Sequence, residues 1–145
     1  MRRITGLARL AAVALLAACQ SSSTDFHLGP TDANIAGQFT LVSINSTPLP
    51  VAALVTATES WALTSDTLSI GASGEWTETT VYAVTQLSDG SISSRTTTAG
   101  GTYAIANQII NFTQTTGGSG TFTGSVQGSS LTLLYNGGHF FYVRT

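Results

Sequence analysis

Side chains able to do acid–base or nucleophilic chemistry are few in this chain of 145 residues. Glu75 and Glu78 are three positions apart, and in a strand such positions point to opposite faces, so we expect both at the solvent-facing surface or rim. His27 and His139 have no third ligand nearby in the sequence, which argues against a metal centre. Ser119 lies between glycines in an expected hairpin loop and lacks a nucleophile elbow. We therefore expect no enzyme, no metal and no cofactor.

Cys19, the only cysteine, has a clearer chemical role. A head with three arginines precedes an apolar run at 10–18, which is the plan of a secretory signal. This run is too short to span a bilayer, which takes about 20 residues. The segment 16–19, Leu-Ala-Ala-Cys, resembles the lipobox of bacterial lipoproteins. The resemblance implies removal of residues 1–18 and lipidation of Cys19; the alternative is ordinary secretion with Cys19 as a free thiol.

The same resemblance implies a location in the bacterial cell envelope. Gln20 follows the cysteine, and in the sorting pattern of this family a residue other than Asp favours the outer membrane. We therefore expect a lipid-anchored protein in the outer membrane, facing the periplasm. Each buried acyl methylene contributes about 0.8 kcal/mol, and two or more chains give stable anchoring.

The charge balance excludes some partners. Without residues 1–18, Arg95 and Arg144 are the remaining arginines, lysine is absent, and all seven acidic residues are kept. Such a chain has no electrostatic footprint for nucleic acid. Anionic head groups would repel it, so the lipid must hold it at the membrane.

The chain is predicted to contain one folded domain behind a tether. Residues 20–36 lack a sustained apolar period and are rich in Ser, Asp, Gly and Pro, which is typical of a flexible linker. Together with the lipidated Cys19 they form the expected tether 19–36. Residues 37–145 then form one domain of ordinary size.

The pattern from residue 37 onward predicts an all-β fold. Thr, Val, Ile, Phe and Tyr dominate short segments separated by Gly, Asn, Asp and Ser. This spacing indicates an antiparallel up-and-down β-barrel of about eight to ten short strands. Segment 51–58 is either one or two helical turns or another strand, and we prefer the strand. The other candidate strands are 38–45, 60–63, 66–70, 75–87, 91–97, 101–106, 109–114, 120–127, 130–135 and 139–144.

Two local patterns concern individual strands and turns. Asn136-Gly137 predicts a two-residue hairpin, because both residues tolerate positive φ. In the segment 75–87, alternation places Trp76 and Tyr82 on the same face as Glu78 and Thr80. A strand cannot bury the aromatic residues and expose the polar ones without a bulge, so the arrangement of this strand stays open.

Several segments resemble one group of proteins. Residues 37–45, GQFTLVSIN, followed by Pro48-Leu49-Pro50, resemble the opening strand GxYxLxxxNGxPLP of small lipocalin-like bacterial lipoproteins, and a similar strand opens META-type envelope domains. Ser46 stands where glycine is common. The segments 101–112, 120–124 and 131–135 resemble the hairpins of the same group. The resemblance covers most of 37–145 and implies a lipocalin-like barrel.

Lipocalins open with Gly-x-Trp, and an arginine from the end of the barrel packs on that tryptophan. Here Phe39 replaces the tryptophan, and Arg144 lies in the last predicted strand. First and last strands are neighbours in a closed barrel. The resemblance therefore implies that Arg144 packs over Phe39 at one end of the barrel; the alternative is a solvated terminal charge.

The aromatic residues admit two functional interpretations. In the first, the barrel is a binding module that holds a small hydrophobic ligand in its mouth. In the second, the aromatic residues fill the core, and the protein is a structural or protein-interaction barrel of the envelope. For the first, the expected ligand-lining residues are Trp61, Trp76, Tyr82, Tyr103, Phe112 and Phe122.

Overall fold

The computed structural model describes residues 31–145, which form ten strands and a one-turn helix. The described residues include no helix long and apolar enough to cross a membrane. The elements are α1 (Asp32–Ile35), β1 (Gly37–Ile44), β2 (Thr47–Pro48), β3 (Val51–Val55), β4 (Glu59–Ile70), β5 (Glu75–Gln86), β6 (Ile92–Ala106), β7 (Ile109–Thr116), β8 (Gly120–Gln127), β9 (Ser130–Tyr135) and β10 (Gly138–Arg144).

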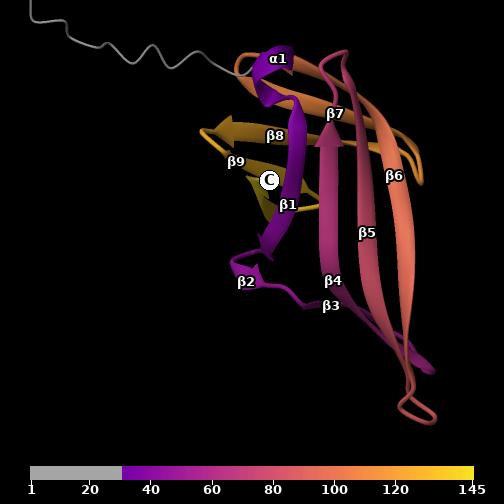
Figure 1. Cartoon of the computed structure of the whole chain (residues 1–145). Coiled ribbons are helices and arrows are strands. Elements are labelled where there is room, and N and C mark those ends of the chain that lie inside the picture. The colour runs from indigo at the N-terminus through magenta and orange to yellow at the C-terminus, as the bar shows by residue number, and fades with distance from the viewer. Residues whose placement is uncertain (1–30) are drawn as a thin grey trace, which may run out of the picture.

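The strands form one antiparallel sheet that closes on itself (Figure 1). Its order is β2-β1-β10-β9-β8-β7-β6-β5-β4-β3, and a further pairing of β1 with β4 completes the ring. The ring holds eight strands, β1 and β4 to β10, while β2 and β3 are additions beyond it. The predicted all-β antiparallel barrel is confirmed.

Tight hairpins connect neighbouring strands. Asn136 and Gly137 have φ of 48° and 77° and join β9 to β10, as predicted. Asn107 and Gln108 turn the chain from β6 to β7 with φ of 53° and 65°. Positive φ at both central residues matches the twist of the flanking strands, so these turns set the register of the sheet.

Two strands are longer than the sequence suggested. Each was expected as two short strands, but β4 and β6 run without interruption. In β4 the register shifts between Leu63 and Ser65, which is a bulge rather than a break. In β6 the expected break between the candidate strands 91–97 and 101–106 is replaced by a register shift between Gly100 and Gly101. A Cβ on Gly101 would overlap the backbone of Thr113, so the close approach of β6 to β7 requires glycine there.

Beyond the barrel, β3 to β6 continue as an open sheet (Figure 1). The segment 51–58 contains β3, so the preference for a strand there is confirmed, and β3 pairs only with β4. The first half of β6 pairs with β5, whereas its pairing with β7 begins at Gly100. The barrel wall is therefore open on one side at this end.

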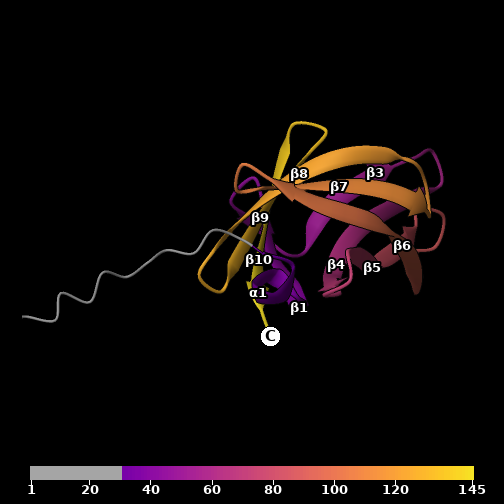
Figure 2. The same ribbon diagram turned by 90° about the horizontal axis from the view of Figure 1, so that it is seen from above.

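The opposite end of the barrel is covered by α1, which lies beside β1 and β10 (Figure 2). The Thr31 side chain accepts a hydrogen bond from the Asn34 backbone N–H, and the Asn34 side-chain oxygen accepts one from the Thr31 backbone N–H, which caps this turn. Ile35 is fully buried in the core. The packed structure thus begins inside the segment that was expected to be tether.

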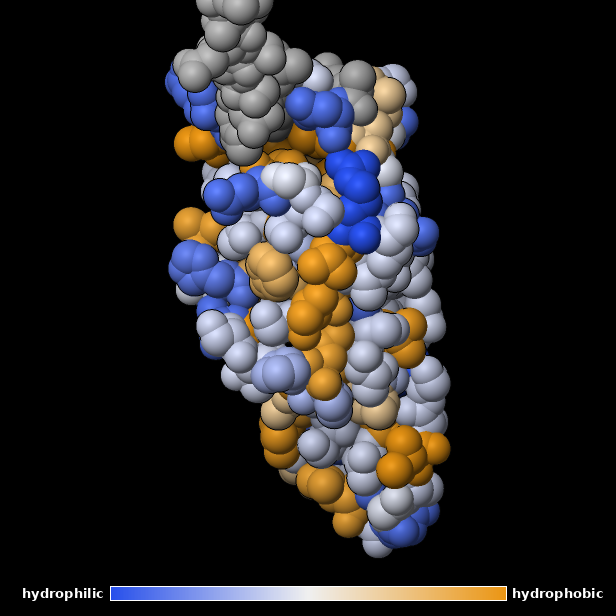
Figure 3. Space-filling view, turned by 60° about the vertical axis from the view of Figure 1, so that its left-hand side comes forward, coloured by the Kyte–Doolittle hydropathy of each residue, from blue (hydrophilic) through white to orange (hydrophobic). Residues whose placement is uncertain are grey.

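The outer surface is mostly uncharged. Figure 3 shows apolar side chains in a broken band among pale, weakly polar residues. Exposed apolar residues occur on the outside of the barrel, for example Val42 of β1 and Phe141 of β10, and on the open sheet, as Leu54 and Val55 of β3. Neutral polar residues therefore separate the apolar ones over much of the visible face.

Candidate functional site: the open end of the barrel

One end of the barrel is sealed by Arg144. Its guanidinium lies 4.6 Å from the centre of the Phe39 ring, within the range of a cation–π contact. It also donates hydrogen bonds to the backbone carbonyls of Ala36 and Asn34, next to α1. This is the packing that the resemblance implied for Arg144 and Phe39, and it joins the two ends of the folded chain.

Gly37 makes room for this arrangement. Its φ is 143°, and a Cβ at this position would overlap the Arg144 guanidinium. Phe39 and Leu68 beneath it are fully buried. The sealed end is therefore apolar beneath Arg144, whose guanidinium contacts an aromatic face and two backbone carbonyls.

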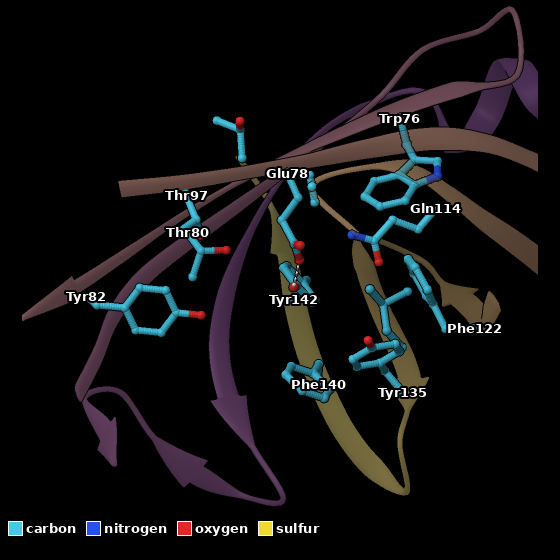
Figure 4. Close-up of a pocket in the computed structure, with 14 residues that line it drawn as sticks. Trp76, Glu78, Thr80, Tyr82, Thr97, Gln114, Phe122, Tyr135, Phe140 and Tyr142 are labelled. Carbon is cyan, nitrogen blue, oxygen red and sulfur yellow. Dashed lines mark hydrogen bonds between the residues drawn. The ribbon is translucent and has the colours of Figure 1, made fainter. Parts of the chain in front are cut away.

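The other end contains a cavity of about 210 Å³. Its wall comes from β5 to β10 and combines aromatic rings with a few polar groups (Figure 4). The aromatic side chains are Trp76, Tyr82, Phe122, Tyr135, Phe140 and Tyr142. An apolar pocket with a few converging polar groups is the usual form of a small-molecule site.

Glu78 reaches from β5 into the middle of this cavity (Figure 4). The strand runs without a register shift of its own, and Trp76, Glu78, Thr80, Tyr82 and Val84 all point inward. The expectation that Glu78 faces solvent or the rim is therefore wrong. The inner face of β5 carries both polar and aromatic residues, because both kinds line the cavity. No bulge in β5 turns the polar residues outward.

Asp66 lies behind Glu78 and forms a carboxyl pair with it. The β4 bulge between Leu63 and Ser65 changes the alternation, so that Leu63 and Asp66 both face inward although they are three apart. Asp66 is directly opposite Thr80, and Glu78 is opposite Leu68. Asp66 and Glu78 are therefore diagonal neighbours on the inner face of the β4–β5 pair.

Few donors serve these carboxyls. The Thr80 hydroxyl donates to Asp66 over 2.9 Å. The Tyr142 hydroxyl lies 3.2 Å from Asp66 Oδ1 and 3.3 Å from Glu78 Oε1. A phenol carries one proton, so it cannot fully satisfy both carboxyls at once.

Burial changes the acidity of the pair. Loss of hydration raises the pKa of Glu78 to about 7, and the nearby Asp66 charge adds to this rise. Burial also raises the pKa of Asp66, while hydrogen bonds from Thr80 and Tyr142 act in the opposite direction. The pKa of Tyr142 is raised well above its usual value by burial and by the two carboxyls. Near pH 7 the pair therefore holds a shared proton in a large fraction of molecules.

The basic side chains of residues 31–145 lie elsewhere. Arg95 stacks over the Trp61 ring at 5.1 Å, Arg144 is at the sealed end, and His139 is exposed. Within the described residues no three His, Cys, Asp or Glu side chains are grouped as a metal site. The fold thus places a carboxyl pair inside the barrel without an arginine or lysine beside it.

The structure divides the six expected lining residues. Trp76, Tyr82 and Phe122 line the cavity. Tyr103 and Phe112 are buried core residues that pack against each other and do not line it. Trp61 lies outside the cavity, between Tyr82 and Arg95. Some of these aromatic residues therefore fill the core, and others line the cavity.

Sequence reasoning missed Asp66, Thr80 and Tyr142 as members of the site. A signal existed in the alternation of segment 75–87, which placed Glu78 and Thr80 with the aromatic residues. Cys19 and His27 lie outside the described residues. Comparisons with protein-family models, with curated proteins and with solved structures find no match to this chain.

Proposed function

We propose that this protein is a lipid-anchored component of the bacterial cell envelope whose barrel binds a small apolar ligand at its open end. The observation that carries the binding function is the aromatic cavity of about 210 Å³ between β5 and β10. Aromatic side chains bury much area in a fixed geometry, which suits them to hold a ligand.

The volume limits the ligand. A dry cavity of about 150 Å³ holds benzene, whereas drug-sized ligands occupy about 300–1,000 Å³. The cavity of about 210 Å³ therefore suits a molecule slightly larger than one aromatic ring. A long acyl chain would fit only if it extended out of the barrel.

We propose further that the protein is not an enzyme. Hydrolases with two carboxyls place them on either side of the scissile bond. Here Glu78 faces the cavity, while Asp66 is buried behind it and does not line the wall. One carboxyl that faces an aromatic pocket suits ligand recognition better than acid–base work by a pair.

The anchor is supported by the sequence alone, through the lipobox-like segment at 16–19. The likeness to lipocalin-like lipoproteins gains support from the eight-stranded barrel and from the Arg144–Phe39 contact. A Cys19→Ser variant should move from the membrane fraction to the soluble fraction. Recovery of Cys19→Ser with the membranes, like the unaltered chain, would reject the anchor.

Native mass spectrometry tests the binding function. The protein should be purified under gentle conditions from cells that express the full chain, and its mass compared with that of the chain alone. A bound species of one small mass supports the cavity as a ligand site. A bare protein, together with failure of small aromatic probes to bind, would overturn it.

A second candidate is a protein-interaction barrel of the envelope. Its support is the free edge of β3, where Leu54 and Val55 are 51% and 67% exposed. Unpaired edges accept a further strand, and an extended peptide with apolar side chains would fit this one. If this edge is the functional surface, Leu54→Lys should abolish a specific cross-link in cells without changing ligand binding in the barrel.

A further inference from the structure

We propose that the ligand of the open end is a protonated amine on an apolar body about the size of a phenyl ring, with its ammonium group on Glu78. This inference rests on the binding function proposed above and names the chemical class of the ligand. It is carried by a carboxyl inside an aromatic cavity, beside which residues 31–145 place no arginine or lysine.

The first step of the argument is charge. Asp66 is buried, and Glu78 is half-buried in the wall of the cavity. The arginines of the described residues are held at Trp61 and at Phe39. A buried carboxylate without a partner is strongly disfavoured. The missing positive charge must come from a proton or from a ligand, and Glu78 is the carboxyl that a ligand can reach.

The second step is hydrogen bonding. The Tyr142 hydroxyl lies between the two carboxyls and has one proton to give. When both carboxyls ionise, acceptor oxygens outnumber the donors supplied by Tyr142 and Thr80. An ammonium group brings up to three N–H donors, and hydrogen bonds between charged partners are the stronger kind.

The third step is the aromatic wall. Trp76 and Phe122 lie to one side of Glu78 and Tyr82 lies to the other, with Phe140 beneath (Figure 4). Aromatic faces attract cations, most strongly where water is excluded, and they also cover an apolar body. The aromatic faces do not attract an anion in this way, and Glu78 would repel it.

The fourth step is selectivity against neutral ligands. A neutral apolar molecule in the cavity would displace water from Glu78 and offer no hydrogen bond in return. An amine of similar shape replaces that water with a charged partner. The site should therefore prefer the cation to its neutral isostere, although both fit the cavity of about 210 Å³.

Protons should be exchanged on binding. The titratable groups around the ammonium position are Asp66 of β4, Glu78 and Tyr82 of β5, Tyr135 of β9 and Tyr142 of β10. Because the pKa of Glu78 is about 7, a cation that binds near neutral pH must displace a proton from the pair. Affinity for an amine should rise from pH 5.5 to pH 8, where alkylamines remain protonated.

The test compares three probes of similar size by isothermal titration calorimetry, on protein purified from cells expressing the full chain. The probes are 2-phenylethylamine, its neutral isostere propylbenzene, and phenylacetate. At pH 8 we expect 2-phenylethylamine to bind about tenfold or more tighter than propylbenzene, with phenylacetate the weakest. Titrations near pH 7 in buffers of different ionisation enthalpy should show proton release with the amine and none with propylbenzene.

Two matched variants locate the effect. Glu78→Gln keeps the shape but removes the charge, and it should reverse the preference so that propylbenzene binds tighter than the amine. Glu75→Gln is the control, because Glu75 is on the same strand but exposed, where it accepts a hydrogen bond from Ser73. It should leave all three affinities unchanged within about twofold.

The outcomes separate the two proposals. The proposal of a cationic ligand is rejected if propylbenzene binds as tightly as the amine, or if Glu78→Gln leaves the preference for the amine intact. The proposed binding of a small apolar ligand would still hold in either case. If none of the probes binds and no small molecule accompanies the purified protein, both proposals are overturned.

Discussion

The two ends of this barrel are built from the same strands but hold opposite interiors. At the sealed end, the Arg144 guanidinium lies on Phe39 and donates to two backbone carbonyls. At the open end, Glu78 and Asp66 lie among aromatic rings with a tyrosine and a threonine as donors. At the sealed end, groups of the chain itself interact with the charge of Arg144. At the open end, the charge of the carboxyl pair is balanced by a proton or by a bound ligand.

The residues of the sealed end stabilise the fold, whereas the carboxyl of the open end belongs to the candidate site. Burial of Phe39, Leu68 and Ile35 removes apolar area from water and favours folding. Burial of an ionised Glu78 opposes folding, because its hydration is lost without an opposite charge. A carboxyl that destabilises the protein in which it lies is consistent with a role in recognition.

The largest effect should follow from emptying the sealed end. Phe39→Ala removes a fully buried ring and its contact with Arg144, so the free energy of unfolding should fall by about 3–5 kcal/mol. Phe122→Ala, at the half-buried wall of the cavity, should lower it by only about 1–2 kcal/mol. Urea unfolding of both variants measures the contrast, and equal losses would contradict it.

The next effect is pH dependence at the open end. The pKa of Glu78 is raised in the folded state, to about 7 from 4.5, so the folded protein binds more protons than the unfolded chain between these values. Its contribution to stability is therefore fully present below pH 4.5 and is lost as pH rises to about 7. The loss should amount to roughly 2–3 kcal/mol.

Glu78→Gln isolates this contribution. The variant should match the unaltered protein near pH 4.5 and exceed its free energy of unfolding at pH 8. Asp66 changes stability in the same direction as Glu78, because burial raises its pKa too. Glu59 and Asp89, whose pKa values are lowered by hydrogen bonds, act in the opposite direction at lower pH. A variant less stable than the unaltered chain at pH 8 would show that the carboxylate supports the fold.

The smallest of the three effects concerns the cation of the sealed end. Arg144→Met removes the cation–π contact and two hydrogen bonds, and it should lower the free energy of unfolding by about 1–2 kcal/mol. Arg144→Lys should recover part of this loss, since a lysine keeps the charge but not the planar fork. Neither variant should alter ligand affinity at the open end. A parallel loss of binding would contradict the independence of the two ends.

The sealed end could be predicted from sequence, and the carboxyl pair could not, for a physical reason. The Arg144–Phe39 contact was implied by the resemblance to lipocalins, and closure of the barrel makes the first and last strands neighbours. The Asp66–Glu78 pair depends on the bulge between Leu63 and Ser65, which brings Asp66 to the inner face. A bulge leaves no regular mark in alternation, so Asp66 could not be placed in advance.

The same limit explains the other differences. Glycines at 100 and 101 suit a turn as well as a close approach of two strands, and only the pairing of β6 with β7 distinguishes them. Ile35, the last residue of α1, has no apolar period around it in the sequence, so its burial depends on the barrel beside it. By contrast, the Asn136-Gly137 turn was predictable because its dihedral angles depend on these two residues themselves.

The most direct test of the two-ended barrel is methyl NMR during titration with propylbenzene, which fits the cavity without regard to charge. Leu133 lines the cavity at the open end, and Ile35 of α1 is fully buried at the sealed end. The account predicts that the Leu133 methyl signals shift in a saturable manner while those of Ile35 stay in place. Unchanged Leu133 signals at saturating propylbenzene would show that the open end holds no ligand and would contradict the account.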